Sequence, residues 1–306
     1  MVVVTPHNMI WQTSRFQIDL TLPKVMGIVN VTPDSFSDGG QHASTAAALK
    51  HCERLLHWGA DILDIGGESS RPGAVPLSLE DELARVVPGV AEAVKLKVPV
   101  SVDTYKPEVM QAVLDLGADI INDIRALQWP GDGAPGLEPP PQHQQAAAAM
   151  GVVAGHPSCG ICLMHMHRDP QTMQVQPMTG DVVPQVLAFW ERIVSSLRAL
   201  GVEDDRILLD PGIGFGKTAP QNFDLLRRQR ELLDAGFPLL IGWSRKSSLA
   251  AAVSTSLATV ATLDTKDRMV PSVAAALLAV ERGASVVRVH DVRETVQALK
   301  VLNAIK

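Results

Sequence analysis

Residues 99–124, PVSVDTYKPEVMQAVLDLGADIINDI, contain one complete strand–helix–strand repeat. The β-branched runs at its two ends, PVSVDT and IINDI, predict strands. Between these runs, Val109, Val113 and Leu116 recur at helical spacing, which predicts an amphipathic helix. Gly117 lies just past the last of them, where glycine commonly ends a helix. The repeat therefore predicts two parallel strands joined by a crossover helix.

The same pattern recurs along the whole chain. Its strand-like runs are continuously apolar rather than alternating, as expected for strands that are covered on both faces. They occupy residues 24–31, 61–67, 99–104, 120–124, 160–166, 206–212, 237–243 and 285–291. The clearest helical patterns between them occupy residues 44–58, 79–96, 107–117 and 182–200. Eight alternations predict an α/β fold, a (β/α)8 TIM barrel, with a doubly wound sheet as the alternative.

Two segments depart from this regular alternation. Residues 1–22 precede the first strand, and we expect them to form an N-terminal extension, a short hairpin that caps the bottom of the barrel. Residues 23–306 then form the barrel as a single domain. Within it, the range of about 125–158 is rich in Pro and Gly and is expected to be an irregular insertion.

Composition excludes several classes of protein. The chain has 306 residues, 46% of them hydrophobic and 20% charged, so it can bury a large core. A net charge of −6 and an aromatic content of 4% argue against nucleic acid as a partner. The longest uncharged runs are broken by Pro, Gly, Ser or Thr, so no membrane span is expected. Three cysteines and the lack of a signal peptide pattern predict a cytoplasmic location.

Polar side chains gather at the C-terminal end of nearly every predicted strand. Those ends form one rim in a parallel barrel, and active sites lie there. The residues are Asn30, Asp64, Asp103, Asn122, Asp123, His165, Asp210, Ser244, Arg245, Lys246, Arg288 and His290, together with the loop residues Glu68–Arg71. We expect Asp64 and Asp123 to be the structural members of this set, capping the helices that follow.

The remaining rim residues indicate two kinds of ligand. Positive donors predict an anionic, phosphorylated group, and they are Arg71, Lys246, Arg288 and His290, with Asn30 as a neutral donor. Acidic and amide side chains predict a heterocycle with adjacent N–H groups, and they are Asp103, Asn122 and Asp210. Two polar, glycine-containing loops at 32–40 and 66–73 are expected to close over the rim as lids.

Three weaker motifs favour structural interpretations. The run GIGFGKT at 212–218 is similar to a phosphate loop, but Pro211 breaks the Walker A pattern. His165 belongs to a His-x-His pair of metal-site spacing without a carboxylate neighbour, so we favour a structural or hydrogen-bonding role for it. Cys159 and Cys162 form a lone C-x-x-C pair, which predicts buried thiols.

Taken together, eight segments resemble the dihydropteroate synthase family, a group of pterin-binding TIM barrels. They are 26–40 (MGIVNVTPDSFSDGG), 64–73 (DIGGESSRPG), 101–104 (SVDT), 121–124 (INDI), 163–166 (LMHM), 210–217 (DPGIGFGK), 244–247 (SRKS) and 288–291 (RVHD). Members of the family are usually homodimers. They are transferases of folate biosynthesis and sulfonamide targets, and they join 6-hydroxymethyl-7,8-dihydropterin pyrophosphate to p-aminobenzoate with release of pyrophosphate.

The resemblance also implies which residues bind each group. The pterin would be bound by Asp103, Asn122, Asp210, Lys246 and Arg288, of which Asp103, Asp210, Lys246 and Arg288 would be catalytic. The pyrophosphate would be bound by Asn30, Ser70, Arg71, Arg288 and His290, with Mg²⁺ as the cofactor on Asn30. The p-aminobenzoate would be bound by Phe36, Ser70, Pro72, Phe215 and Ser247.

The chain departs from the family pattern at two places. Ser70 stands where many members have Thr, and Pro271-Ser272 stands where Gly-Ser is common. Three other functions are alternatives. A methyltetrahydrofolate–corrinoid methyltransferase shares the acid–amide pattern but needs no pyrophosphate site, so Arg288 and His290 argue against it. A non-catalytic pterin-binding paralogue and a phosphate-loop hydrolase are the others.

Overall fold

Eight parallel strands form the central sheet of the computed structural model, which describes residues 10–31, 40–71, 73–128, 142–254 and 264–305. Their order is β8-β7-β6-β5-β4-β3-β10-β9. The strands are β3 (Lys24–Asn30), β4 (Ile62–Gly66), β5 (Val100–Asp103), β6 (Ile120–Asp123), β7 (Gly160–Met164), β8 (Ile207–Asp210), β9 (Leu240–Ile241) and β10 (Val286–Val289). Each lies inside a range predicted from the sequence, which confirms all eight.

The sheet closes on itself. Its two end strands, β8 and β9, meet through a parallel bridge between Leu209 and Leu239. The amide of Leu209 donates to the carbonyl oxygen of Pro238 at 3.0 Å at the same place. An open doubly wound sheet would leave both end strands unpaired, so the (β/α)8 barrel is confirmed and the alternative is wrong.

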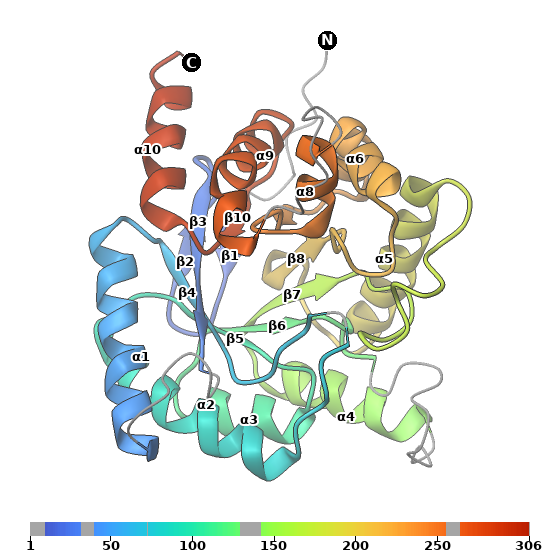
Figure 1. Cartoon of the computed structure of the whole chain (residues 1–306). Coiled ribbons are helices and arrows are strands. Elements are labelled where there is room, and N and C mark those ends of the chain that lie inside the picture. The colour runs from blue at the N-terminus through green and yellow to red at the C-terminus, as the bar shows by residue number, and fades with distance from the viewer. Residues whose placement is uncertain (1–9, 32–39, 72, 129–141, 255–263, 306) are drawn as a thin grey trace.

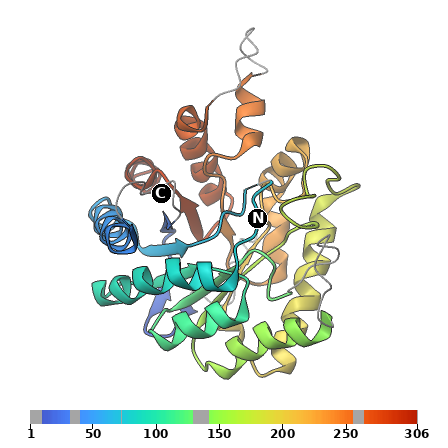
Figure 2. The same cartoon turned by 60° about the horizontal axis from the view of Figure 1, so that its bottom comes forward.

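Helices cover the outside of the barrel, and every strand is followed by at least one of them (Figures 1 and 2). They are α1 (Gly40–His57), α2 (Leu79–Ala93), α3 (Pro107–Asp115), α4 (Gln142–Gly155), α5 (Val182–Ala199), α6 (Ala219–Arg227), α7 (Gln229–Leu232), α8 (Ser247–Ser254), α9 (Met269–Glu281) and α10 (Val292–Asn303). Start signals are visible in the sequence, as at α6, where Thr218 and Gln221 form a capping box. No helix in the described part of the chain has the length and hydrophobicity that a bilayer crossing needs.

The range expected to be an irregular insertion, 125–158, is partly regular. Its second half contains α4, whose alanine run at 146–149 has a high intrinsic helix propensity. The Pro-rich part, 129–141, lies outside the described residues. The insertion therefore extends the connection between β6 and β7, while the crossover helix itself is kept.

The N-terminal residues form the expected hairpin at the bottom of the barrel. β1 (Ile10–Gln12) and β2 (Gln17–Asp19) pair antiparallel. Trp11 is fully buried, and its indole N–H donates to the carbonyl oxygen of Arg206 at 3.0 Å. Its ring belongs to a buried cluster with residues near the strand starts, namely Met26, Ile62, Ile120, Cys162, Leu208, Leu240 and Val286. The hairpin therefore closes the end of the barrel opposite to the rim.

Strand register brings the predicted rim residues to one level. Asn30 is paired with Gly66, Gly66 with Asp103, and Asp103 with Asn122. On the far side of the barrel Asp210 is the last residue of β8. The backbone thus supplies one ring of positions at the C-terminal ends of the strands, as the sequence predicted.

The hairpin gives a first test of the fold. We expect Trp11→Ala to lower the free energy of unfolding by about 3–5 kcal/mol, because it removes a fully buried indole from the barrel bottom. Urea denaturation monitored by far-UV circular dichroism, which does not rely on tryptophan fluorescence, measures this change. Leu22→Ala, at a side chain that is 59% exposed, is the control and should change stability by less than about 0.5 kcal/mol. A loss below about 1 kcal/mol for Trp11→Ala would contradict the role of the hairpin.

Candidate active site

A partly buried arginine links the carboxylates inside the barrel. Arg288 on β10 donates from Nε to Asp64 Oδ2 at 2.6 Å and from Nη2 to Asp103 Oδ2 at 2.8 Å. Asn122 on β6 donates from Nδ2 to both oxygens of Asp64, at 3.3 Å each. Four strands therefore contribute to one connected polar network, and three of its four members were predicted site residues.

Asp64 is the member whose role the sequence analysis assigned wrongly. It was expected to cap the next helix, but its side chain is fully buried, and it also accepts the hydroxyl proton of Ser101 at 2.7 Å. Asp64 lies two residues after Ile62, which faces the barrel interior, so the strand alternation directs both side chains inward. Asp123 is structural, as expected, but it caps no helix of the described chain: it accepts the amides of Arg125 and Leu127 at 2.7 Å in the turn after β6, and the next helix there begins at Gln142.

Burial dominates the acid chemistry of the network. Burial raises the pKa of Asp103 to about 7, against the Arg288 charge that lowers it, and Asp64 raises it further. Burial also raises the pKa of Asp210 to about 6, although the amide of Gly212, which donates to Asp210 at 2.7 Å, lowers it. Both carboxyl groups are thus poised to exchange a proton within about a unit of neutral pH.

Lys246 and Phe215 form the wall next to Asp210. The ammonium of Lys246 lies 4.0 Å from the centroid of the Phe215 ring, which is a close cation–π contact. Burial lowers the pKa of Lys246 to about 8, against the opposing effect of Asp210. Lys246 therefore remains mostly protonated at neutral pH, while its proton is held less tightly than that of an exposed lysine.

His290 is surrounded by positive charge. Its Nδ1 lies 2.9 Å from the hydroxyl oxygen of Ser244. Burial lowers the pKa of His290 to about 3, and the charges of Arg245, Arg288, Arg71 and Lys246 lower it further. The prediction that His290 is a positive donor was therefore wrong, because an imidazole with this pKa is neutral at neutral pH. The charges of cations from distant segments therefore all act on the His290 imidazole.

Lys217, the lysine of the GIGFGKT run at 212–218, had no predicted site role and is buried. Its ammonium contacts His165 Nδ1 at 2.9 Å and the carbonyl oxygens of Gly212 at 3.0 Å and Phe215 at 3.1 Å. Burial lowers the pKa of Lys217 to about 7. The lysine thus fastens the loop after β8, which carries Phe215, to the end of β7. The hydrogen-bonding role predicted for His165 is confirmed.

The glycines of the same loop permit close packing. Gly212 has φ +66°, and a Cβ there would lie 1.9 Å from the carbonyl oxygen of His165. Gly216 has φ +70°, and a Cβ there would lie 2.3 Å from the carbonyl oxygen of His167. These glycines thus let the loop after β8 lie directly against the segment that follows β7. The predicted buried thiols are confirmed, because Cys52, Cys159 and Cys162 are free and buried.

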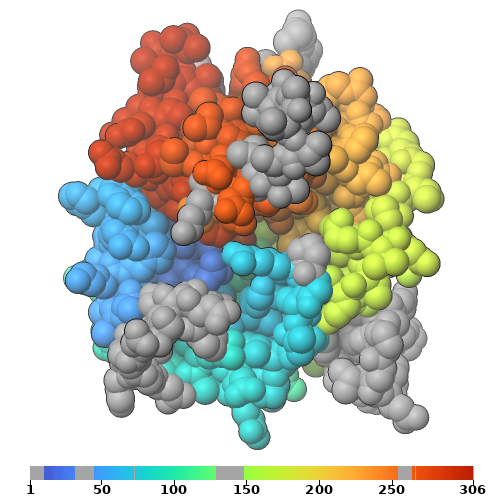
Figure 3. All heavy atoms as spheres, viewed as in Figure 1, coloured from blue at the N-terminus to red at the C-terminus, as the bar shows by residue number. Residues whose placement is uncertain are grey.

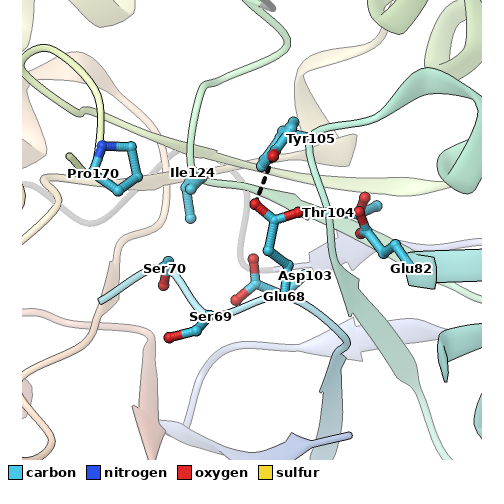
Figure 4. Close-up of a pocket in the computed structure, with 9 residues that line it drawn as sticks. All are labelled: Glu68, Ser69, Ser70, Glu82, Asp103, Thr104, Tyr105, Ile124 and Pro170. Carbon is cyan, nitrogen blue, oxygen red and sulfur yellow. Dashed lines mark hydrogen bonds between the residues drawn. The ribbon is translucent and has the colours of Figure 1, made fainter. Parts of the chain in front are cut away.

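The remaining predicted residues lie around the rim. Asn30 is half-buried at the end of β3, and Ser247 is exposed at the start of α8. Ser70 lies on the loop after β4 and lines a hollow that Asp103 also borders (Figure 4). In the space-filling view this loop, in cyan, lies near the centre of the molecular face (Figure 3). The predicted residues Phe36 and Pro72 lie outside the described residues.

Comparisons with known proteins point to one family. The model of the family described as pterin binding enzyme matches residues 26–290. The dihydropteroate synthase of Neisseria meningitidis serogroup B is 46% identical over 301 residues, which are 97% of each chain. A Burkholderia cenocepacia dihydropteroate synthase, solved with 7,8-dihydropteroate, has a TM-score of 0.80 and 43% identity, and the match covers 97% of this chain and 96% of that one. A Yersinia pestis dihydropteroate synthase, solved in a sulfonamide drug complex, has a TM-score of 0.83 and 40% identity, covering 97% and 99%.

The buried network gives a second test. We expect Asp64→Asn to lower the free energy of unfolding by about 3 kcal/mol, because it breaks a buried ion pair and leaves Arg288 with less compensation. Asp204→Asn is the matched control, since it breaks the Arg198–Asp204 pair, whose side chains are 54% and 50% exposed. Its loss should stay below about 1 kcal/mol. Equal losses in urea denaturation would show that Asp64 does not anchor the network.

Proposed function

The chain belongs to the pterin binding enzyme family and is an enzyme of the dihydropteroate synthase class, and from this premise we propose how its own residues carry the reaction. The enzyme joins 6-hydroxymethyl-7,8-dihydropterin pyrophosphate to p-aminobenzoate, giving 7,8-dihydropteroate and pyrophosphate in folate biosynthesis. One observation carries the assignment of roles: Asp103 and Asn122 converge with Arg288 in the barrel interior, and further cations surround His290 at the rim. The carboxylate and amide side chains suit the hydrogen-bond donors of a heterocycle. The cationic side chains suit its anionic tail.

The pterin is bound by Asp103, Asn122, Asp210 and Lys246. A carboxylate accepts two parallel N–H bonds, which suits the amino-pyrimidine edge of a pterin. Asn122 donates from Nδ2 to Asp64, so its amide oxygen is the atom that would accept a hydrogen bond from the ligand. Lys246 adds a donor on the side of Asp210, and Arg288 flanks the ring from β10.

The pyrophosphate is bound by Asn30, Ser70, Arg71, Arg288 and His290. Arg71 and Arg288 supply charge-assisted donors, and neutral His290 supplies an N–H group. Binding an anion there would remove part of the repulsion that lowers the pKa of His290. This second, basic half of the site favours the synthase over a pterin-binding methyltransferase, which needs no pyrophosphate site.

Mg²⁺ is the proposed cofactor of this half, and Asn30 would hold it. The described residues contain no group of three His, Cys, Asp or Glu side chains placed to bind a metal ion. An amide oxygen such as that of Asn30 fits Mg²⁺, which keeps several waters and is often held by few protein ligands plus substrate phosphates. When bound, Mg²⁺ supplies charge neutralisation for the leaving pyrophosphate.

The substitution is dissociative. The bond between the exocyclic carbon of the pterin and the pyrophosphate oxygen breaks, and both of its electrons leave with the oxygen. Positive charge develops on that carbon, where the carboxylates of Asp103 and Asp210 stabilise it, while Arg71 and Arg288 stabilise the leaving anion. The amine nitrogen of p-aminobenzoate then attacks the carbon and loses a proton. Since the arylamine is the nucleophile, the chain supplies positioning and electrostatics.

The p-aminobenzoate is bound by Phe36, Ser70, Pro72, Phe215 and Ser247, with Ser247 at its carboxylate. Phe215 is buried beside Lys246, and Ser247 is exposed at the start of α8. A sulfonamide would bind at the same subsite in this proposal, and the Yersinia pestis relative was solved in a sulfonamide drug complex.

A homodimer in the cytoplasm completes the proposal. Val270 on α9 is 69% exposed and Val301 on α10 is 68% exposed, and the two helices pack on each other. Apolar side chains on adjacent helices support an interface with a second copy of the chain. Free, buried cysteines support a reducing compartment.

An assay with purified chain tests the function directly. We expect dihydropterin pyrophosphate and p-aminobenzoate to yield dihydropteroate and pyrophosphate, measured by coupled pyrophosphate release and chromatography. Chelating Mg²⁺ should abolish the product, because the leaving anion then loses its main source of charge neutralisation. Adding Mg²⁺ back restores turnover in the same sample. A chain that binds the pterin but forms no product under any of these conditions would be a non-catalytic paralogue.

Asp103 provides the sharper test of mechanism. We expect Asp103→Asn to reduce kcat about 100-fold or more, since it removes a charge that stabilises the transition state. The Kd for the bare pterin, 6-hydroxymethylpterin, should change far less. In the unaltered chain kcat/KM, which reports the ionisation of the free enzyme, should rise between pH 5 and 8, because the pKa of Asp103 is raised to about 7 and only its deprotonated form stabilises the cation. Equal losses in kcat and binding would contradict this role.

A further inference from the structure

Three charged side chains meet behind the loop that carries Ser70 and Arg71. Lys106 donates from its ammonium to Glu68 Oε2 at 2.5 Å and to Glu82 Oε2 at short range. Glu68 belongs to the loop after β4, Lys106 follows β5, and Glu82 lies on α2. We call this cluster the ion triad. It is well shielded, because Glu82 is 1% exposed and Lys106 is 9% exposed.

Tyr105 reinforces the triad from the side of the active site. Its hydroxyl donates to Glu68 Oε1 at 2.6 Å, so both oxygens of that carboxylate are held (Figure 4). The ammonium of Lys106 lies 4.5 Å from the centre of the Tyr105 ring. Because Glu68 receives two hydrogen bonds from neighbours on a rigid segment, the start of the loop has little freedom.

The backbone on either side of Glu68 and Arg71 is also fastened. Arg85 on α2 donates to the carbonyl oxygen of Gly67 at 3.2 Å. A Cβ at Gly67 would lie 2.6 Å from a methyl group of Val86, so this end of the loop lies directly on α2. At the other end, the amide of Gly73 donates to the carbonyl oxygen of Pro170 at 3.1 Å. The loop was expected to be a lid, but both of its ends are tied to neighbouring segments.

We propose that the ion triad of Glu68, Lys106 and Glu82 sets the position of Arg71, and that Lys106 is a positioning residue for recognition of the anionic leaving group. This role rests on the proposed function. Arg71 itself is exposed, yet its charge acts on His290 across the rim, so its placement decides how strongly it reaches the pyrophosphate. A loop held at its base presents this cation without the entropy cost of ordering a free segment.

Removing Lys106 would do more than delete one contact. Glu68 and Glu82 would face each other as two poorly solvated carboxylates, and their repulsion would push the loop away from α2. Glu82 also raises the pKa of Asp103, so the ammonium balances a charge that acts on the catalytic carboxylate. The expected consequence is displacement of Arg71, with the pterin cradle of Asn122 and Asp210 left in place.

Binding measurements on variants test the proposal. By isothermal titration calorimetry we expect Lys106→Met to weaken dihydropterin pyrophosphate about tenfold, or about 1.4 kcal/mol. Bare 6-hydroxymethylpterin should weaken less than about twofold, because it lacks the anion that Arg71 binds. The double variant Arg71→Ala, Lys106→Met should bind no more weakly than Arg71→Ala alone, since the triad acts through that arginine.

Lys95→Met is the matched control, because Lys95 pairs with Glu92 at the protein surface with 66% of its side chain exposed. It should bind both ligands as the unaltered chain does. Equal weakening of the two ligands by Lys106→Met would overturn the proposal, and so would losses that multiply in the double variant. An inactive unaltered chain would instead contradict the proposed function, so the two failures can be told apart.

Tyr105→Phe keeps the proposal testable if Lys106→Met does not fold. It keeps the ring between Lys106 and Arg125 and removes only the hydroxyl that donates to Glu68. We expect a loss of about two- to fivefold for the pyrophosphate ligand, a typical effect for one hydrogen bond, with unchanged affinity for the bare pterin. Identical effects on the two ligands would overturn the positioning role.

Discussion

The contact of Arg288 with Asp64 and Asp103 is the interaction on which the site depends. An arginine and two carboxylates cannot be buried together unless their hydrogen bonds are satisfied from several directions. A closed barrel allows this, since β10, β4 and β5 direct side chains into one interior. The hairpin at the barrel bottom excludes water from the opposite end through the buried Trp11. The charges of the site are therefore compensated only because the barrel is closed.

The strands and the rim could be predicted from the sequence because both follow from local signals. Apolar runs fix the strands, and a parallel barrel fixes where their polar ends meet. What could not be predicted depends on register and on neighbours that are distant in sequence. Asp64 resembled a helix cap until its strand partner positions were known. The charge of His290 depends on four cations from three separate segments of the chain, and no local pattern reports their distance from the imidazole.

Negative and positive side chains occupy different parts of the site. The carboxylates of Asp103 and Asp210 lie at the ends of β5 and β8, and the charges of Arg71, Arg245, Lys246 and Arg288 act on His290 after β10. A dissociative substitution separates charge along the same axis, with a cationic carbon on one side and an anionic leaving group on the other. Side-chain charges that are already oriented stabilise both developing charges without reorganisation. Such preorganised electrostatics is usually the largest single contribution to lowering a barrier of this kind. The arrangement thus fits the chemistry more closely than it fits simple pterin binding.

Two buried lysines hold the loops that border this field. Lys106 fastens the loop after β4 through carboxylates, and Lys217 fastens the loop after β8 through carbonyl oxygens and His165. Each ammonium has lost most of its water and is compensated only if several acceptors stay in place. Moving either loop would leave a buried ammonium without its acceptors and raise the free energy. This penalty opposes displacement of the loops. Buried cations of this kind therefore tie two rim loops to the segments beside them.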